Sequence, residues 1–250
     1  MTQEQTIPVV DLRHFTQGDQ ETRQAFVKAL GESLEEYGFV AVEGHGIPRD
    51  LIYENYSNFQ RFFEMPEDIK KKYEDPETGR QRGYTSFGVE HAKDNAKADL
   101  KEFYHLGREL DADHPLATRV VKNIWPDELP VIKEKGLKLF DAMDSCASSL
   151  LAAVSLYLGL PEDFFPSMAK DGSNIIRIIR YPVCEGFDEA GVMRAAQHED
   201  INLMTILPEA TESGLELLTR EGEWLPIRAI EGQIIVDTGD MMARVTNGKL

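Results

Sequence analysis

The chain has 250 residues, 42% of them hydrophobic and 28% charged, proportions typical of a soluble globular protein long enough to bury a continuous core. Its formal net charge of -17 argues against nucleic acid as a partner, because duplex binding needs basic patches that displace counterions. The same charge implies that an anionic small substrate would need a local cluster of Arg or Lys inside its pocket.

Neither a targeting segment nor a membrane span is predicted. The N-terminus has no basic region followed by an apolar stretch, so it does not resemble a signal peptide. No apolar run approaches the roughly 20 residues that cross a bilayer. The two cysteines, Cys146 and Cys184, lack metal-ligand spacing and are typical of reduced thiols. We therefore expect a cytoplasmic protein without a membrane partner.

Predicted strands and helices alternate in an N-terminal region that we assign to residues 1–110. Apolar runs and helical spacing predict, in chain order, a strand over 7–12, a helix over 21–37 that ends at Gly38, a strand over 39–42, a helix from Pro48 to Phe63, and a strand over 102–106.

A long segment from Asp75 to Asp99 interrupts this pattern with Gly, Pro and charged residues. A loop of this length in a compact domain usually carries function, so we expect it to flank or cover a pocket. Arg82 and Tyr84, in its Arg-Gly-Tyr sequence, are candidates for substrate contact. The alternative is that both are ordinary solvated loop residues.

The remaining chain divides into a helical region, 111–172, and a β-rich region, 173–250. A long apolar period predicts one helix over 129–158 that ends at Gly159 and backs the sheet. Short β-branched and apolar runs then predict strands at 175–181, 201–207, 214–218, 223–227, 233–237 and 241–246. Such spacing is typical of a sandwich or barrel, so we expect an α+β protein with a mainly β core.

His198 and Asp200 stand two positions apart at the start of one of these apolar runs. Side chains two apart in an extended chain emerge on the same face, so an imidazole and a carboxylate would meet there. They would supply two ligands of a 2-His-1-carboxylate Fe(II) site. The alternative for His198 is a hydrogen-bonded histidine at a strand end, because a His-x-Asp triplet alone also occurs by chance.

Several short motifs surround this pair in a fixed order. They are Ile-Pro-Val-Val-Asp-Leu at 7–12, Tyr-Gly-Phe-Val-Ala-Val-Glu-Gly-His-Gly-Ile-Pro at 37–48, Asp-Leu-Lys-Glu-Phe-Tyr at 99–104, Arg-Tyr-Pro at 180–182, His-Glu-Asp at 198–200, Gly-Leu-Glu-Leu-Leu at 214–218, Trp-Leu-Pro-Ile at 224–227 and Asp-Thr-Gly-Asp at 237–240. In this order they resemble the isopenicillin N synthase-like family of non-haem Fe(II)/2-oxoglutarate-dependent oxygenases.

The resemblance implies a double-stranded β-helix, or jelly roll, with N-terminal helices packed around it. By position it makes His198 and Asp200 iron ligands, and Tyr181 a hydrogen-bond donor to a cosubstrate or substrate carboxylate. For Tyr181 the pattern alone also fits a half-buried aromatic residue before a proline.

The Asn247-Gly248 pair predicts a type I′ hairpin turn, which requires a returning strand. We therefore expect the 250-residue chain to end inside its β core, with the C-terminal core strand truncated. In the family, the third iron ligand, a His, and an Arg that binds the cosubstrate carboxylate lie on that next strand. Without them, we expect this polypeptide to bind iron poorly and to be inactive or weak.

The resemblance implies an enzyme that uses Fe(II), 2-oxoglutarate and O2 to hydroxylate or otherwise oxidise a small-molecule substrate, with release of succinate and CO2. Two alternatives stay open. One is an oxidase like isopenicillin N synthase, which needs no 2-oxoglutarate. The other is a non-catalytic jelly-roll binding protein. The motifs identify neither the prime substrate nor the oligomeric state.

Overall fold

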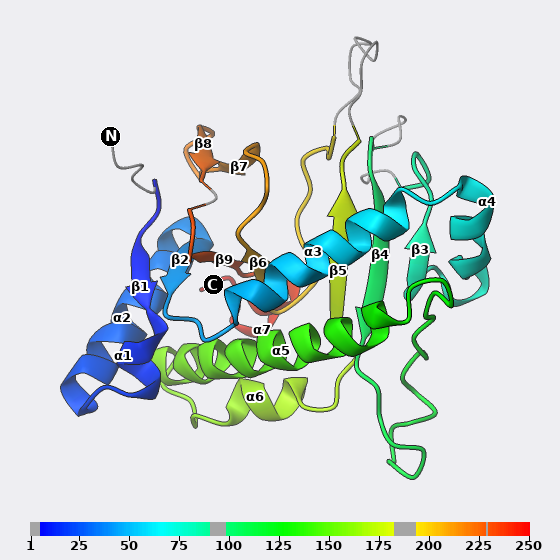
Figure 1. Cartoon of the computed structure of the whole chain (residues 1–250). Helices are drawn as coiled ribbons and strands as arrows, with labels where there is room; N and C mark the ends of the chain where they lie inside the picture. The colour runs from blue at the N-terminus through cyan, green and yellow to red at the C-terminus, as the bar shows by residue number, and fades with distance from the viewer. Residues whose placement is uncertain (1–5, 91–98, 183–193, 229) are drawn as a thin grey trace. The chain divides into compact units, whose positions relative to one another are not determined.

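The computed structural model describes residues 6–90, 99–182, 194–228 and 230–250 (Figure 1). The chain forms two compact units. Both units are assembled from segments that are distant in the sequence. The first comprises Met1–Ile47, Ala142–Lys170 and Glu199–Leu250, and the second comprises Pro48–Asp141 and Asp171–His198.

A four-stranded sheet lies at the centre of the first unit. Its order is β1 (Val9–Asp11), β2 (Phe39–Glu43), β9 (Ile234–Asp237) and β6 (Thr205–Pro208), with β1 parallel to β2 and the other pairs antiparallel. A separate antiparallel pair joins β7 (Leu215–Leu218) to β8 (Trp224–Ile227). Apolar side chains from both sheets form one buried cluster that includes Ala41, Ile235, Leu217 and Ile227.

The described residues of the first unit also form the helices α1 (Leu12–Thr16), α2 (Gln20–Tyr37), α6 (Phe164–Ala169) and α7 (Asp240–Val245). The predicted helix over 21–37 is confirmed by α2. The Asp19 side chain accepts a hydrogen bond from the Thr22 amide at its start, and Gly38, with φ of 70°, ends it. Its buried face carries Phe26, Leu30 and Leu34, as helical spacing requires.

The second unit is built on an antiparallel sheet of β3 (Gly83–Thr85), β4 (Glu102–Gly107) and β5 (Ile175–Arg180). One face of this sheet carries Tyr84 and Tyr104. Helix α3 (Arg49–Phe63) packs along that face, and the Phe62 ring centroid lies 5.1 Å from that of Tyr104 (Figure 1). The short helices α4 (Glu67–Lys70), η1 (Lys71–Tyr73) and η2 (Pro76–Thr78) follow.

Glu102 lies on the same face, where charged and polar side chains surround its carboxylate. Its carboxylate is almost fully buried and accepts hydrogen bonds from Lys70 Nζ at 2.6 Å, from Arg180 Nη1 at 3.0 Å and from the Tyr84 hydroxyl. A buried carboxylate is tolerated only when it is paired and hydrogen-bonded in this way. This face of the sheet is therefore a sealed part of the core.

The long predicted helix is confirmed as α5 (Val131–Tyr157). Contrary to the expectation that no segment could span a bilayer, α5 is long and apolar enough to do so by length and composition. However, half of its most apolar stretch is buried inside the protein. The core helix of a soluble protein has the same properties, so α5 is weak evidence for a membrane span. Its Cys146 is a buried free thiol, whereas Cys184 lies outside the described residues.

Three predictions for the β-rich region are wrong. Residues 241–246 do not form a strand, because they lie in α7 and the turn that follows it. Asn247 and Gly248 do have positive φ, at 55° and 75°, but they end a helix instead of reversing a hairpin: the Gly248 amide donates to the Ala243 carbonyl at 2.7 Å. The same left-handed conformation serves helix ends and type I′ turns.

The third error concerns where β6 begins. Its first residue is Thr205, so residues 198–204 are irregular and His198 and Asp200 precede the strand instead of opening it. The predicted loop over 75–99, of which residues 91–98 lie outside the described residues, contains β3, whose pairing with β4 buries Tyr84. Arg82 and Tyr84 are each 1% exposed, so the solvated alternative for them is wrong.

We expect Gly31→Ala to lower the free energy of unfolding. A Cβ at Gly31 would lie 2.1 Å from the ring of Tyr157, whose hydroxyl is held by Glu35. Overpacking of this kind costs about 1–3 kcal/mol and opposes a helix-propensity gain of about 1 kcal/mol. Urea denaturation would measure the change, with Gln24→Ala on the exposed side of α2 as the control. An increase in stability like that of the control would contradict this packing.

Candidate active site

The Asp200 carboxylate is fixed by residues of its own segment. Its Oδ2 accepts hydrogen bonds from Thr205 Oγ1 at 2.6 Å and from Asn202 Nδ2 at 3.3 Å. Its backbone carbonyl accepts from the Asp240 amide at 2.9 Å, and a Cβ at Gly239 would lie 2.2 Å from that carbonyl oxygen. The Asp-Thr-Gly-Asp motif therefore needs glycine there, because only glycine allows this approach.

His198 is exposed, and a contact with the backbone orients its ring. Nδ1 lies 2.8 Å from the carbonyl oxygen of Ala196. Since a carbonyl can only accept, Nδ1 carries the proton and the lone pair resides on Nε2. This is the tautomer that a histidine adopts when it binds a metal through Nε2, with its other nitrogen held by a carbonyl.

The segment that carries His198 is anchored by Asp99, a residue that sequence reasoning did not single out. Asp99 is 2% exposed, and its Oδ1 accepts a hydrogen bond from the Ala196 amide at 3.1 Å. Its Oδ2 lies 2.9 Å from Lys101 Nζ, which also contacts Glu90 at 2.9 Å. Burial lowers the pKa of Lys101, but these two carboxylates outweigh it and raise the pKa overall. The only sequence sign of this anchor was the motif at 99–104.

Tyr181 directly follows β5 and is 40% exposed. Burial of its ring raises the pKa of the hydroxyl, while the charge of Lys101 acts to lower it and that of Asp99 to raise it. The net increase keeps the hydroxyl protonated near neutral pH, so it can donate a hydrogen bond to a carboxylate. Tyr181 and Asp99 thus belong to one polar neighbourhood.

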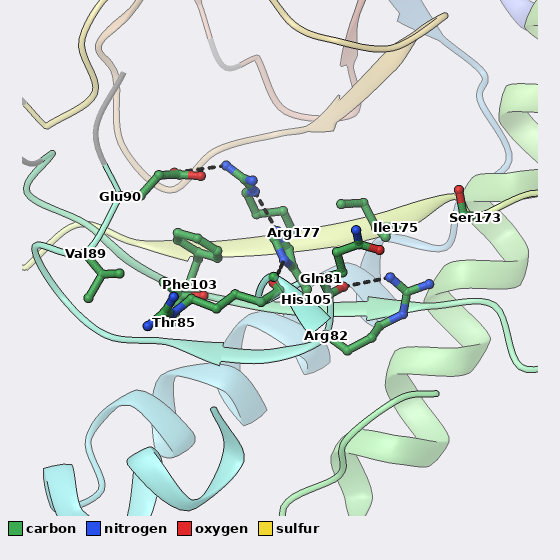
Figure 2. Close-up of a pocket in the computed structure, with 12 residues that line it drawn as sticks. Gln81, Arg82, Thr85, Val89, Glu90, Phe103, His105, Ser173, Ile175 and Arg177 are labelled. Atoms are coloured by element: carbon green, nitrogen blue, oxygen red, sulfur yellow. Dashed lines mark hydrogen bonds and ion pairs between the residues drawn. The ribbon is translucent and has the colours of Figure 1, made fainter. Parts of the chain in front are cut away.

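A cavity of about 500 Å³ lies on the face of the β3-β4-β5 sheet opposite the aromatic core (Figure 2). Arg82 lines it, and burial lowers the pKa of its guanidinium. Tyr84 does not line it: Thr85, the next residue of β3, faces the cavity, so Tyr84 points to the opposite face with its partner Tyr104. Substrate contact by Tyr84 therefore has no support in its position.

His105 and Arg177 face each other across β4 and β5 in the wall of this cavity (Figure 2). Arg177 Nε donates to His105 Nε2 at 2.7 Å, and His105 Nδ1 lies 2.9 Å from the Arg80 carbonyl oxygen. The histidine is therefore neutral, with its proton on Nδ1. Burial, aided by the charge of Arg177, lowers the pKa of His105 to about 4.

No group of three or more His, Cys, Asp or Glu side chains that could hold a metal ion is found among the residues that the structure describes. The donor chemistry of His198 and Asp200 nevertheless suits Fe(II), which is commonly bound by neutral imidazole and carboxylate. The sequence motifs predicted none of the other histidines as a ligand.

The depressed pKa of His105 predicts a stability loss at acidic pH. Because the unfolded chain has the ordinary pKa of 6.5 and the folded chain about 4, the unfolded state binds more protons between these values. Stability should fall as pH decreases through this window, by up to about 3 kcal/mol from this group. Urea denaturation at pH 7, 5.5 and 4 would show a smaller fall for His105→Gln. The same pH dependence in both proteins would refute this, and His14→Gln, an exposed site, is the control.

Comparison with known proteins places the chain in a family. Residues 7–128 match the model described as non-haem dioxygenase in morphine synthesis N-terminal, and residues 172–250 match the 2OG-Fe(II) oxygenase superfamily. A proline hydroxylase from Petromyces alliaceus is 30% identical over 239 residues, covering 91% of this chain and 73% of that protein. A 2-oxoglutarate-Fe(II) type oxidoreductase from Aspergillus fumigatus is 27% identical, covering 99% and 76%.

Solved structures give the same result. A 2OG-Fe(II) oxygenase family protein from Caulobacter crescentus has a TM-score of 0.87 and 35% identity, covering 99% of this chain and 78% of that one. A full-length Neurospora crassa protein in complex with alpha-KG and thymine has a TM-score of 0.84 and 27% identity, covering 98% and 77%. The chain shares the jelly-roll fold of these oxygenases. It therefore belongs to the 2OG-Fe(II) oxygenase superfamily, and it is a non-haem iron enzyme that uses 2-oxoglutarate and O2 to oxidise its substrate.

Proposed function

We propose that His198 and Asp200 are two of the protein ligands of Fe(II), and that Tyr181 donates a hydrogen bond to a carboxylate of 2-oxoglutarate or of the substrate. The observation that supports this most is the contact between His198 Nδ1 and the Ala196 carbonyl. It fixes the tautomer that can coordinate a metal through Nε2. The spacing of two residues between His198 and Asp200 places the two ligand types in one short segment.

The bound iron, with 2-oxoglutarate and O2, supplies the oxidising chemistry that converts 2-oxoglutarate to succinate and CO2 and oxidises the substrate. The side chains of this chain bind and orient. Thr205 and Asn202 hold one oxygen of the Asp200 carboxylate in a fixed direction. Asp99 holds the backbone that orients His198, and the protonated Tyr181 hydroxyl can hold a carboxylate in place.

The substrate is a small molecule. Relatives support this, since the Neurospora crassa protein has been solved with thymine, and the Petromyces alliaceus relative is a proline hydroxylase. We propose hydroxylation of a carbon atom as the reaction outcome. An oxidase that does without 2-oxoglutarate, and a binding protein without catalysis, are less favoured, because the relatives are named as 2-oxoglutarate-Fe(II) enzymes.

The iron ligands can be tested by binding and turnover together. We expect His198→Ala and Asp200→Ala each to weaken Fe(II) binding beyond the roughly 10- to 100-fold loss seen when a residue supporting a ligand is removed. Anaerobic calorimetry with Fe(II) measures binding, and succinate formation from 2-oxoglutarate with O2 uptake measures turnover. His14→Ala and Asp111→Ala, at exposed positions, are the matched controls. Unchanged Fe(II) affinity in either test variant would mean that the proposed ligands are wrong.

Asp99 can be tested separately as a residue that positions His198. We expect Asp99→Asn to weaken Fe(II) binding by about 10-fold. The side-chain amide oxygen would accept the hydrogen bond from the Ala196 backbone amide less strongly than the carboxylate does, and the variant would lack the ion pair with Lys101. Circular dichroism and thermal melting would show that the variant folds. A folded variant with wild-type Fe(II) affinity would show that the anchor does not act on His198. The exposed Asp111→Asn is the control for loss of one negative charge.

A further inference from the structure

The cavity on the polar face of the β3-β4-β5 sheet carries a local charge opposite to that of the whole chain. Three arginines, Arg80, Arg82 and Arg177, line it together with one carboxylate, Glu90, while His105 is neutral. Two positive charges are therefore in excess there, in a chain of net charge -17. A cluster of this kind is what an acidic protein needs to bind an anionic small molecule.

Arg177 is held on three sides. Its Nε donates to His105 Nε2 at 2.7 Å, its Nη1 lies 3.2 Å from Glu90 Oε2, and its Cζ lies 4.5 Å from the centre of the Phe103 ring (Figure 2). Nη2 has no partner among the described residues, and the side chain is 36% exposed. The guanidinium is thus fixed in place with one edge available, which lowers the entropy cost of binding a carboxylate.

His105 makes this arrangement possible because it is neutral. A protonated imidazole would repel the guanidinium, whereas the neutral ring accepts its Nε–H. The ring is oriented by the carbonyl of Arg80, whose backbone has the rare positive φ of 58°. Strained backbone of this kind is concentrated at ligand-binding sites.

Other polar atoms in the lining also lack partners. Nε and Nη2 of Arg82, Nε of Arg80 and Oγ1 of Thr85 are buried without a hydrogen bond. Arg82 and Thr85 are each 1% exposed. Buried polar groups without partners are rare in folded proteins, and these four atoms all belong to residues that line this one cavity. The apolar side chains of Phe103, Val89 and Ile175 line the same space.

We propose that this cavity binds the prime substrate of the enzyme and that the substrate carries a carboxylate, which Arg177 binds with its free edge while the apolar body packs against Phe103. The inference rests on the proposed function, because it places the substrate of that reaction here. Arg82 and Thr85 form part of the cavity wall. A volume of about 500 Å³ suits a small molecule, within the range of about 300–1,000 Å³ common for ligand pockets.

The test uses phenylacetate and its neutral counterpart phenylacetamide as probes. Each is titrated by calorimetry into the full chain, held anaerobically with Fe(II) and saturating 2-oxoglutarate so that the cosubstrate site is filled. We expect phenylacetate to bind about tenfold more tightly than the amide, a typical effect of one good ionic hydrogen bond. Arg177→Gln should abolish the preference and Arg177→Lys should retain part of it, because Lys keeps the charge but loses the fork.

Arg61→Gln, at an exposed position of α3, is the matched control and should keep the preference. Equal binding of the two probes, or a preference that survives in Arg177→Gln, would overturn the proposal. Inorganic phosphate is a third probe, measured by its displacement of phenylacetate. If phosphate binds more tightly than phenylacetate, the site binds free phosphate and the substrate assignment is wrong.

Fe(II) and 2-oxoglutarate affinity, measured in the same preparations, separates the two proposals. If phenylacetate is preferred through Arg177 but the His198→Ala variant still binds Fe(II), the carboxylate site stands and the proposed iron ligands are wrong. If the two probes bind equally but Fe(II) binding depends on His198 and Asp200, the iron ligands stand and the carboxylate site is wrong.

Discussion

The arrangement of the cavity depends on the pairing of β4 with β5. Their six-residue register places Phe103 opposite Ile179 and His105 opposite Arg177. Alternation then sends Phe103, His105 and Arg177 to one face and Glu102 and Tyr104 to the other. A slip of one residue would turn His105 or Arg177 away from the cavity and toward the aromatic core.

The two faces of the β3-β4-β5 sheet differ in how fully their buried polar groups are hydrogen-bonded. On the core face, the Glu102 carboxylate is satisfied by an ammonium, a guanidinium and a phenol, so nothing is left to bind. On the cavity face, Arg82 and Thr85 are as deeply buried but keep atoms without partners. Complete satisfaction is what a structural network requires, whereas incomplete satisfaction costs stability unless a ligand compensates for it. The two faces therefore differ in how completely their buried polar groups are hydrogen-bonded.

The sequence predicted the helices that short-range sequence patterns determine. Helices α2 and α5 follow from apolar periodicity and from the glycines that end them. It failed at residues 241–246, whose composition suits a strand, because Asn247-Gly248 can end a helix as well as reverse a hairpin. It also missed the role of Asp99, because the contact with the Ala196 amide spans 97 residues and no spacing rule reaches that far. Arg82 was predicted near substrate, but not as a buried group.

The negative charge of the chain does not oppose an anionic ligand at this site. At physiological ionic strength, exposed charges are screened beyond about 8 Å, so the surface carboxylates act weakly inside the cavity. The guanidinium of Arg177 is partly withdrawn from water and acts at contact distance, where screening is slight. The neutrality of His105 matters for the same reason: in a poorly screened cavity, one added charge beside Arg177 would disrupt the geometry that holds it, and a neutral acceptor leaves the positive charge directed at the ligand.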